Sequence, residues 1–567
     1  MFRFQSRWKL KKLQHVCSDD ACARAFALAR APSRSTMSRW LACLAAFSTA
    51  ASVTATPLAC QPNAAEPMMP LFHIIGNVTP VGDTFSLEPI NDASGITFYQ
   101  GLYHIWHQCC QNHWDHLISA DLAHWQRLPP PIQPLTLKTW DGSITLLPDA
   151  DGGPVILYDA QDGKLGSHGE DPRGPLDKSI IGVARPAIHD KYLMLWERAP
   201  ENPVNFTGAP TEFPGQVWKN GDHYNFIGEG NRYSTTDPTL HAWTNMGPFV
   251  GARDHSGQWW APTPNQIDGT PPPAGVPNRV VNVGGGATYM FGDYNASAET
   301  FTPWTPNGPS PIVSTLERGK ADWFGGQGGA DNNDRMMIIG WALPDWNSAG
   351  TPQRQTTGAL TRLTLLREVN FDVPTQGLVS NPVPELAALR TAVIANETGV
   401  ALSPEPHVVG GTEGGAAASA DVVVTFSGFS DGDVFGACVL SSGNITGIAI
   451  AITVNATDAT ATLKTCNATL SGDADDSETS AGTTFPLLGD STITLRVLPD
   501  RSVADFFLQG GRWAGTTSWL DPKTPRRAED SSVLLFATNG EGVLADTLAW
   551  SMGCGWVDPS YTDAPTM

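Results

Sequence analysis

Short hydrophobic runs, broken by turn residues, dominate the chain, and few segments show the spacing of a long helix. Residues 96–107 mix aromatic and polar positions, whereas residues 153–159, 192–196 and 336–341 are compact apolar runs. Gly, Asp, Asn and Pro separate these runs, which is typical of strands that end in tight turns. Many short strands with dense turns indicate a propeller, a barrel or a sandwich. The pattern therefore predicts an all-β chain.

The pattern changes near residue 400, where aromatic residues become sparse. Residues 410–418 are rich in Gly and Ala, which is typical of a flexible joint. Beyond them, runs rich in Val, Thr and Ile alternate as half-buried strands do. These runs are residues 421–426, 447–454, 492–498 and 532–537. We expect an antiparallel β-sandwich over residues 410–560, a normal size for one domain.

The N-terminal end has the composition of a signal peptide. Arg39 gives a short positive region after Met37, residues 41–51 are small and apolar, and residues 53–55 form a small-residue cleavage site. The apolar run is too short to span a membrane comfortably. We therefore expect no membrane association once the signal is cleaved.

This assignment divides the N-terminal part of the chain. The signal peptide covers residues 37–55, and the mature protein is expected to begin near Thr56. Residues 1–36 are unusual in front of a signal peptide. Either translation begins at Met37, or residues 1–36 are a targeting extension; a signal anchor is a third alternative. The mature chain is expected to be secreted, or held in a vacuolar-type secretory compartment.

Sequons and cysteines agree with a secreted glycoprotein. Seven Asn-x-Ser/Thr sequons follow the signal, at Asn77, Asn205, Asn295, Asn396, Asn444, Asn455 and Asn467. The mature chain has an even number of cysteines, which suits an oxidising compartment: Cys60, Cys109, Cys110, Cys438, Cys466 and Cys554. Cys438 and Cys466 flank a predicted hairpin, and we expect them to be bonded. Zinc-site spacing is absent, so we expect neither a metal nor a cofactor.

The charge balance makes nucleic acid an unsuitable partner. The 567 residues carry a net charge of −21, although residues 1–55 hold nine Lys and Arg against two Asp and Glu. An acidic body repels phosphate backbones but is compatible with a neutral substrate. The chain also has 19 Trp, a residue that packs between strands and stacks on sugar rings.

The order of motifs near the start of the predicted strands resembles glycoside hydrolase family 32, the invertases and fructan hydrolases. Glu88-Pro-Ile-Asn-Asp-Ala-Ser-Gly resembles the Asn-Asp-Pro-Asn-Gly motif of the family. A Tyr-Gln-Gly-Leu-Tyr-His strand, a Gln, Trp114-Asp-His and Ser119-Ala-Asp-Leu-Ala-His-Trp follow in the order of the family. Trp140-Asp-Gly-Ser resembles the next motif, Phe-Ser-Gly-Ser.

Later motifs extend this resemblance from about Phe72 to Trp556. Asp322-Trp-Phe-Gly, Arg335-Met-Met-Ile-Ile-Gly-Trp and Leu366-Arg-Glu look like the late propeller motifs of the family. Leu498-Pro-Asp-Arg-Ser-Val-Ala-Asp resembles the sandwich signature Asp-Arg-Ser-x-x-Glu. The resemblance implies a five-bladed β-propeller over residues 66–390, followed by the sandwich. It also implies a β-fructofuranosidase-like glycosidase with sucrose or an oligosaccharide as substrate.

The resemblance implies a set of site residues in the first blades. Asp92 matches the family nucleophile, in a turn just before a strand that aims it into the axial funnel. The alternative is a turn Asp that caps its own backbone. Asn91, Gln108, Trp114 and Ser143 are expected to contact substrate, and blade packing is the alternative for them.

Two motifs of the family are altered. Where the family has Arg-Asp-Pro, this chain has Glu212-Phe-Pro, so Phe213 stands at the position of the Asp. Trp259-Trp-Ala-Pro-Thr is the best match to Trp-Glu-Cys-Pro-Asp of the family, so Trp260 stands at the position of the acid/base. Trp260 cannot transfer a proton to an oxygen, and we expect it to contact substrate instead.

Two hypotheses follow from these changes. In the first, a displaced carboxylate replaces the acid, with Asp254 as first choice and Glu212 or Asp268 as alternatives. The protein then hydrolyses or transfers fructosyl units through a covalent intermediate on Asp92. In the second, the protein binds carbohydrate without turnover. A retaining enzyme needs two carboxylates about 5–5.5 Å apart, so the surroundings of Asp92 distinguish the hypotheses.

Overall fold

The computed structural model describes most of the chain after the predicted signal peptide. All described residues belong to one compact unit, which begins at Pro57. They are residues 60, 68–81, 84–109, 113–132, 138–161, 179–211, 214–250, 259–260, 276–284, 288–304, 313–315, 317–318, 327–330, 335–342, 362–441, 447–466, 482–518, 531–540 and 542–557.

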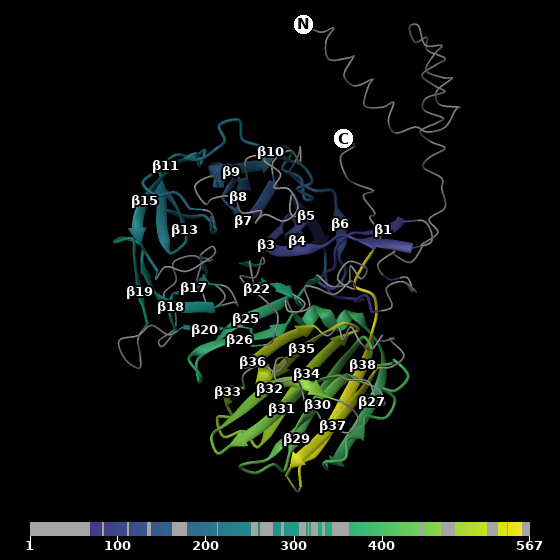
Figure 1. The fold of residues 1–567 in the computed structure, drawn as a ribbon. Coiled ribbons are helices and arrows are strands. Elements are labelled where there is room, and N and C mark those ends of the chain that lie inside the picture. Colours follow the sequence, from purple (N-terminus) through teal and green to yellow (C-terminus); the bar gives the residue numbers. More distant parts are fainter. Residues whose placement is uncertain are drawn as a thin grey trace, which may run out of the picture. The chain divides into compact units, whose positions relative to one another are not determined.

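Among these residues, five small sheets follow one another along the chain (Figure 1). The first contains β3 (Ile90–Tyr99), β4 (Leu102–Cys109), β5 (His113–Ser119) and β6 (Gln126–Leu128). The second contains β7 (Lys138–Leu146), β8 (Pro154–Gln161), β9 (Ser179–Pro186) and β10 (Trp196–Arg198). The third contains β11 (Asn205–Thr207), β12 (Trp218–Asn220), β13 (His223–Gly228), β14 (Asn231–Thr235) and β15 (Ala242–Pro248).

Two further sheets complete the set of five. The fourth contains β16 (Trp259–Trp260), β17 (Arg279–Gly284), β18 (Thr288–Asn295), β19 (Thr300–Pro303) and β20 (Val313–Thr315). The fifth contains β21 (Gln327–Ala330), β22 (Met336–Ile339), β25 (Arg367–Asp372) and β26 (Gly377–Pro382). Two short pairs lie outside them: β1 (Val78–Val81) with β2 (Thr84–Leu87), and β23 (Trp341–Ala342) with β24 (Arg362–Leu363).

The five sheets are the blades of a propeller. Strand β3 lies beside β7 of the second blade and also beside β21 of the fifth blade, so the first and last blades adjoin. This closure leaves only short blade edges exposed, which protects an antiparallel fold from edge-to-edge pairing. The all-β fold with five blades that the sequence predicted is confirmed.

One predicted strand is wrong. Residues 192–195 form an irregular turn, and β10 begins only at Trp196. The side chain of Asp190 accepts hydrogen bonds from the backbone amides of Tyr192 (2.8 Å) and Leu193 (2.9 Å). A carboxylate that caps the following amides stabilises a turn, so the apolar run is buried without being a strand.

Two six-stranded sheets then face each other as a sandwich in the described part of the chain (Figure 1). One contains β27 (Arg390–Ala401), β38 (Leu544–Met552), β29 (Ala420–Ser427), β34 (Thr492–Asp500), β35 (Val503–Leu508) and β36 (Trp513–Ser518). The other contains β28 (His407–Val408), β37 (Ser532–Asn539), β30 (Val434–Ser441), β31 (Gly447–Asn455), β32 (Asp458–Cys466) and β33 (Thr483–Pro486).

Helix is confined to short 3-10 turns in the described residues. These are η2 (Asp149–Asp151), η7 (Pro384–Leu389) and η9 (Gln509–Gly511). A search of the same residues finds no helix with the length and apolar character to cross a membrane.

The sandwich begins earlier than residue 410. Strand β27 pairs with β38 from Arg390 onward, in the sheet that also holds β29. The Gly/Ala-rich residues 410–418 lie inside the sandwich instead of before it. Thr412 is fully buried, and its hydroxyl oxygen accepts a hydrogen bond of 3.1 Å from the amide of Val533. The small residues allow tight turns in a packed segment, which composition alone does not distinguish from a flexible joint.

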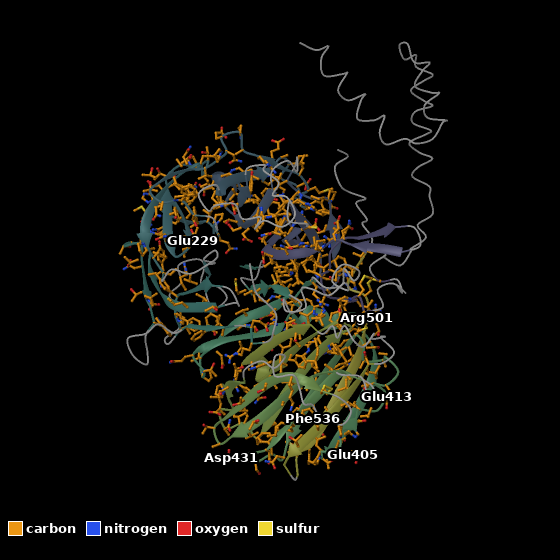
Figure 2. All side chains as sticks on the ribbon, viewed as in Figure 1. Glu229, Glu405, Glu413, Asp431, Arg501 and Phe536 are labelled. Atoms are coloured by element: carbon orange, nitrogen blue, oxygen red, sulfur yellow. A yellow bond between two sulfur atoms is a disulfide. The ribbon has the colours of Figure 1, made fainter. Side chains whose placement is uncertain are left out.

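The predicted disulfide between Cys438 and Cys466 is confirmed. It links β30 to β32 across β31, with 6.2 Å between the Cα atoms. The fully buried ring of Phe536 belongs to the same hydrophobic cluster (Figure 2). A second disulfide, Cys60–Cys554, joins residues 494 positions apart. The sequence did not indicate this pair, because no local spacing connects its two cysteines.

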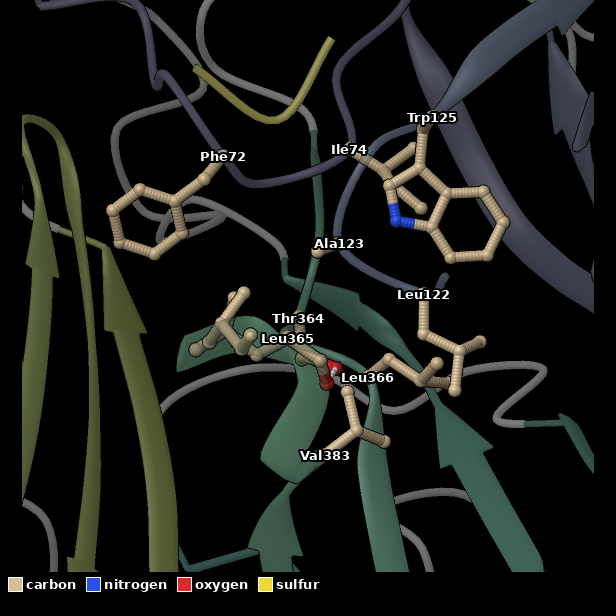
Figure 3. Close-up of a pocket in the computed structure, with 10 residues that line it drawn as sticks. Phe72, Ile74, Leu122, Ala123, Trp125, Thr364, Leu365, Leu366 and Val383 are labelled. Atoms are coloured by element: carbon tan, nitrogen blue, oxygen red, sulfur yellow. Dashed lines mark hydrogen bonds between the residues drawn. The ribbon is translucent and has the colours of Figure 1, made fainter. Parts of the chain in front are cut away.

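Propeller and sandwich meet over an apolar layer and a polar one. The apolar layer encloses a small pocket below Trp125 (Figure 3). The pocket is lined by Phe72, Ile74, Leu122, Ala123, Trp125, Thr364, Leu365, Leu366, Val383 and Leu386. These side chains come from before the first blade, from the first and fifth blades and from η7. Four of them form a hydrophobic cluster with Leu498, Phe507 and Met552 of the sandwich, so the pocket adjoins the boundary.

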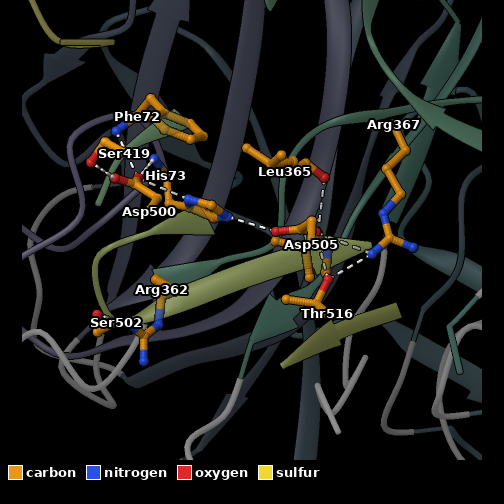
Figure 4. A network of polar contacts seen from close by, with 12 residues as sticks. Phe72, His73, Arg362, Leu365, Arg367, Ser419, Asp500, Ser502, Asp505 and Thr516 are labelled. Atoms are coloured by element: carbon orange, nitrogen blue, oxygen red, sulfur yellow. Dashed lines mark hydrogen bonds and ion pairs between the residues drawn. The ribbon is translucent and has the colours of Figure 1, made fainter. Parts of the chain in front are cut away.

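The polar layer is centred on His73, which is buried between two carboxylates of the sandwich (Figure 4). Its ring nitrogens lie 2.9 Å from Asp500 Oδ2 and 2.8 Å from Asp505 Oδ2. Burial alone would lower the pKa of His73, but hydrogen bonds and charge from Asp500 and Asp505 outweigh it and raise the pKa above 6.5. The imidazole is therefore held as a cation between two anions.

Motifs that the sequence singled out supply the rest of this network. Arg367, from the Leu-Arg-Glu motif, donates to Glu317 (2.8 Å), Thr516 (2.6 Å) and Asp505 (3.3 Å). Asp505 and Asp500 both come from the sandwich signature. These motifs therefore hold the two halves together, far along the chain from the predicted nucleophile.

Candidate active site

The first strands of blades 1 and 2 each carry a β-bulge. In β3, Ile90 pairs with Cys109 and Ala93 pairs with His107, so two residues of β3 lie opposite one of β4. The two residues of β3 are Asn91 and Asp92, and the residue of β4 opposite them is Gln108. A bulge of this kind re-aims side chains and is common beside active sites.

The bulge of β7 has the same form. Thr139 pairs with Ala160 and Gly142 pairs with Tyr158, so Trp140 and Asp141 lie opposite Asp159. Like β3, β7 is the first strand of its blade, and the two strands lie side by side. Two bulges with an aspartate in each thus occupy neighbouring first strands.

Asp92 lies in β3 itself and not in a turn before it, as the sequence had suggested. Its side chain is buried, with 8% exposed. The sequence interpretation missed this because Asn-Asp is a common turn dipeptide, whereas the ladder to β4 continues through the bulge. The structure thus places the predicted nucleophile on a rigid element with a fixed aim.

Gln108 connects the two bulges. It is 2% exposed, lies opposite Asn91 and Asp92, and donates a hydrogen bond from its side-chain amide to Asp141 Oδ1. Asn91 is partly exposed beside it. The structure therefore brings Asn91, Asp92 and Gln108 together, as the sequence predicted, and adds Asp141 to them.

Trp114 and Ser143 take part in blade packing. Trp114 is fully buried, and its indole nitrogen donates a hydrogen bond of 2.6 Å to the carbonyl of Trp140. Ser143 is 1% exposed and donates a bond of 2.7 Å to the carbonyl of Gly215. Both contacts position β7 against its neighbours. A role for these two side chains in binding substrate stays a prediction.

The remaining predicted residues lie at the other blades or outside the described residues. Trp260 lies in β16, the first strand of blade 4, where it pairs with Val280; its side chain is not described. Glu212, Asp254 and Asp268 fall outside the described residues. The hypothesis that one of them replaces the family acid stays a prediction.

Sequence reasoning missed Asp141 and Asp159. The signal for Asp141 was present, because Trp140-Asp-Gly-Ser has an aspartate where the resembling family motif has a serine. Asp159, which is 5% exposed, ends the apolar run of residues 153–159 and looked like a turn residue. Its place opposite the bulge follows only from strand pairing.

A group of possible metal ligands at the C-terminal end of β4, next to Gln108, does not suit a metal. Atoms of Cys109, His113 and Asp115 lie within 4.8 Å of one another. However, Cys109 is in a disulfide and offers no thiolate. Burial would raise the pKa of Asp115, but Arg127 and the neighbouring histidines hold it well below its usual value, and Arg127 also forms an ion pair with it. We assign this cluster to the packing of blade 1.

Curated relatives include plant proteins named beta-fructofuranosidase or fructan 1-exohydrolase. An insoluble beta-fructofuranosidase isoenzyme of Arabidopsis thaliana is 25% identical over 383 residues, which are 59% of this chain and 60% of that protein. A fructan 1-exohydrolase of Aegilops tauschii is 24% identical over 346 residues, or 54% of each chain. The alignments thus span no more than about 60% of the length of these relatives.

Solved structures share the fold over nearly their whole length. Fructan 1-exohydrolase IIa from Cichorium intybus has a TM-score of 0.67 at 20% identity and covers 87% of this chain and 99% of its own. Exo-inulinase from Aspergillus awamori has a TM-score of 0.63 at 20% identity, with the same coverage. The model of the glycosyl hydrolases family 32 N-terminal domain matches residues 87–382, from the end of β2 to the end of the fifth blade. This match covers more than half of the chain, and the chain therefore belongs to glycosyl hydrolases family 32.

Proposed function

We propose that the protein is a retaining glycosidase that releases fructosyl units from sucrose or fructans, with Asp92 as nucleophile. The observation that carries this proposal is the bulge of β3, which holds a buried aspartate beside Asn91 and Gln108 within the segment that matches the family. The names of the relatives, beta-fructofuranosidase and fructan 1-exohydrolase, support fructosides as the substrate class.

The arrangement suits a two-step mechanism. The Asp92 carboxylate attacks the anomeric carbon of the fructosyl group, and the bond to the leaving oxygen breaks while that oxygen takes a proton. Water then hydrolyses the fructosyl ester and restores Asp92. Asn91 and Gln108 supply amide groups that can hydrogen-bond sugar hydroxyls on the same side. If a sugar hydroxyl replaces water in the second step, the product is a transfer product.

A second candidate function is carbohydrate binding without turnover. Two sequence changes favour it, because Trp260 stands where the family has its acid/base and Phe213 where it has the aspartate of Arg-Asp-Pro. Losing a general acid costs about 10²–10⁴-fold in rate, so a chain that lost both groups without replacement would turn over very slowly.

We also propose that the mature protein acts outside the cell or in a secretory compartment. The predicted signal peptide over residues 37–55 and the sequons support this location. Several relatives are named insoluble isoenzymes, which agrees with an extracellular site for those proteins. Mass analysis of secreted protein should find an N-terminus near Thr56, and an intact Phe2 would contradict it.

The test of function is sugar release from sucrose, inulin and levan by the purified mature chain. We expect fructose from at least one of them, and a loss of about 10⁴-fold or more for Asp92→Asn, since removing a nucleophile removes the covalent step. Asp149→Asn is the matched control, because Asp149 is exposed in η2 of blade 2. A wild-type chain that binds fructans but releases no sugar would establish the binding function instead.

A further inference from the structure

We propose that Asp141 is the second carboxylate of this site and gives its proton to the leaving oxygen. The inference rests on the proposed function, since a proton donor matters only where a glycosidic bond is broken. It answers a chemical need: the leaving oxygen requires a proton, and Trp260 at the family acid/base position has none to give.

Asp141 and Asp92 lie at corresponding points of adjacent strands. Each belongs to the bulge of the first strand of its blade. A Cβ atom added to Gly95 of β3 would collide with the side chain of Ile144 in β7, so these two residues touch. Asp92 precedes Gly95 by three residues and Asp141 precedes Ile144 by three residues. Both aspartates therefore lie shortly before the point where β3 and β7 touch, one on each side of the boundary between the blades.

Gln108 sets how close the two bulges are. It lies in β4 directly opposite Asn91 and Asp92, and its side chain reaches across the boundary to Asp141 Oδ1. One glutamine side chain thus bridges the strand next to Asp92 and the carboxylate of Asp141. Retaining glycosidases use two carboxylates on either side of the scissile bond, and this bridge links the surroundings of the two.

Packing around β7 fixes the position of Asp141. The carbonyl of Trp140, its neighbour in the bulge, accepts a bond of 2.6 Å from Trp114. Gly142, its neighbour on the other side, lies so close to Trp114 and Tyr158 that a Cβ atom would sit 2.9 Å and 2.8 Å from them. A catalytic group needs this kind of support, because a small misplacement costs much of the rate.

A third aspartate lies beside the two bulges. Asp159 lies opposite the bulge of β7, so three aspartates gather at adjoining strands: Asp92, Asp141 and Asp159. An acid next to an ionised nucleophile is the pairing that the first chemical step needs.

Both aspartates take part in both chemical steps. Asp92 Oδ forms a bond to the anomeric carbon, the bond from that carbon to the leaving oxygen breaks, and the proton of Asp141 moves to the leaving oxygen. In the second step, a water molecule gives a proton back to Asp141. The oxygen of that water attacks the anomeric carbon and displaces Asp92. The sum is hydrolysis of one glycosidic bond, with both aspartates restored.

The test compares Asp141→Asn with wild type on sucrose and on an activated aryl β-fructofuranoside. An aryl leaving group needs little protonation, so we expect sucrose cleavage to fall about 10²–10⁴-fold and aryl cleavage to fall less than about tenfold. The alkaline limb of the wild-type pH profile should also disappear. Asp141→Ser restores the residue of the family motif, should fold readily, and should show the same split. Asp149→Asn again serves as the control for a carboxylate of blade 2.

Each result has one meaning. If wild type is active and either folded Asp141 variant keeps sucrose cleavage within about threefold, the inference is wrong and the proposed function stands. If both substrates are lost equally and Gln108→Ala reproduces the loss, Asp141 only positions Gln108, and the inference is again wrong. If wild type cleaves neither substrate, the proposed function itself fails. Loss of sucrose cleavage on substitution of Asp254, with Asp141→Asn unaffected, would assign the proton to that residue.

Discussion

Gly142 shows how a single residue supports the candidate site. It lies between the bulge of β7 and Ser143, against the carbonyl of Leu157 and the ring of Trp114. The absence of a side chain lets blade 1 approach β7, and this approach brings Gln108 to Asp141. The resemblance drew attention to this Gly as part of a motif, and its physical role is close packing.

We predict that Gly142→Ala destabilises the protein and impairs activity together. The added methyl group would overlap backbone atoms of β8, and overpacking of this kind costs about 1–3 kcal/mol. Denaturant unfolding measures the change. Gly377→Ala is the matched control, because a Cβ atom there meets nothing nearer than 3.5 Å, and we expect a change within about 0.5 kcal/mol. Equal stability of the two variants would refute the close-packing role.

At the scale of elements, strand pairing explains both the successes and the failures of the sequence prediction. The runs at residues 421–426, 447–454 and 532–537 became β29, β31 and β37, because alternating Val, Ile and Thr suit a half-buried strand. Residues 192–195 failed because Asp190 caps a turn there. Apolar runs report burial more reliably than they report strand geometry.

We predict that the disulfide across β31 stabilises the sandwich by about 3 kcal/mol. Cys438 and Cys466 are 28 residues apart, and closing a loop of this length removes roughly that much entropy from the unfolded chain. The double variant Cys438→Ser with Cys466→Ser should unfold at a correspondingly lower denaturant concentration. Peptide mapping without reduction should find the two cysteines linked, and two free thiols would contradict the prediction.

At the scale of the whole molecule, the boundary between propeller and sandwich depends on buried charge. His73 precedes the first blade, whereas Asp500 ends β34 and Asp505 lies within β35 of the sandwich. His73 is more than 400 residues from either aspartate in sequence. Removing one partner of a buried charged set leaves the others without compensation, which is costly.

We predict that His73→Gln lowers the free energy of unfolding by about 3–5 kcal/mol. The matched control is His124→Gln, because His124 forms an exposed pair with Asp121 and such pairs contribute about 0–1 kcal/mol. Thermal and denaturant unfolding of the two variants measure the difference. A loss of less than 1 kcal/mol for His73→Gln would show that the boundary does not depend on this cation.

The same network predicts how stability depends on pH. The pKa of His73 is raised above 6.5, so its contribution is complete below pH 6.5 and is lost as pH rises through the folded-state pKa. Burial would raise the pKa values of Asp500 and Asp505, but their bonds to His73 lower them below 3.8. Their contribution is complete above pH 3.8 and is lost in acid. Wild-type stability should therefore fall at both extremes, and His73→Gln should remove the alkaline part of the fall.

The sequence by itself determined the all-β class, the order of propeller and sandwich and the Cys438–Cys466 bond, and it drew attention to Asp92. These features rest on local information, namely hydrophobic alternation, turn residues and short motifs. It also placed Asn91 and Gln108 beside Asp92, because one motif and the strand after it form a hairpin.

Only the tertiary structure decided which distant groups meet. The register of β3 against β4 and of β7 against β8 places Asp92 and Asp141 in the bulges of neighbouring strands, and a shift of one residue would turn either away. The Cys60–Cys554 bond and the setting of His73 likewise join segments with no shared pattern. Pairing across blades and domains depends on packing of the whole chain, and a local sequence pattern does not predict it.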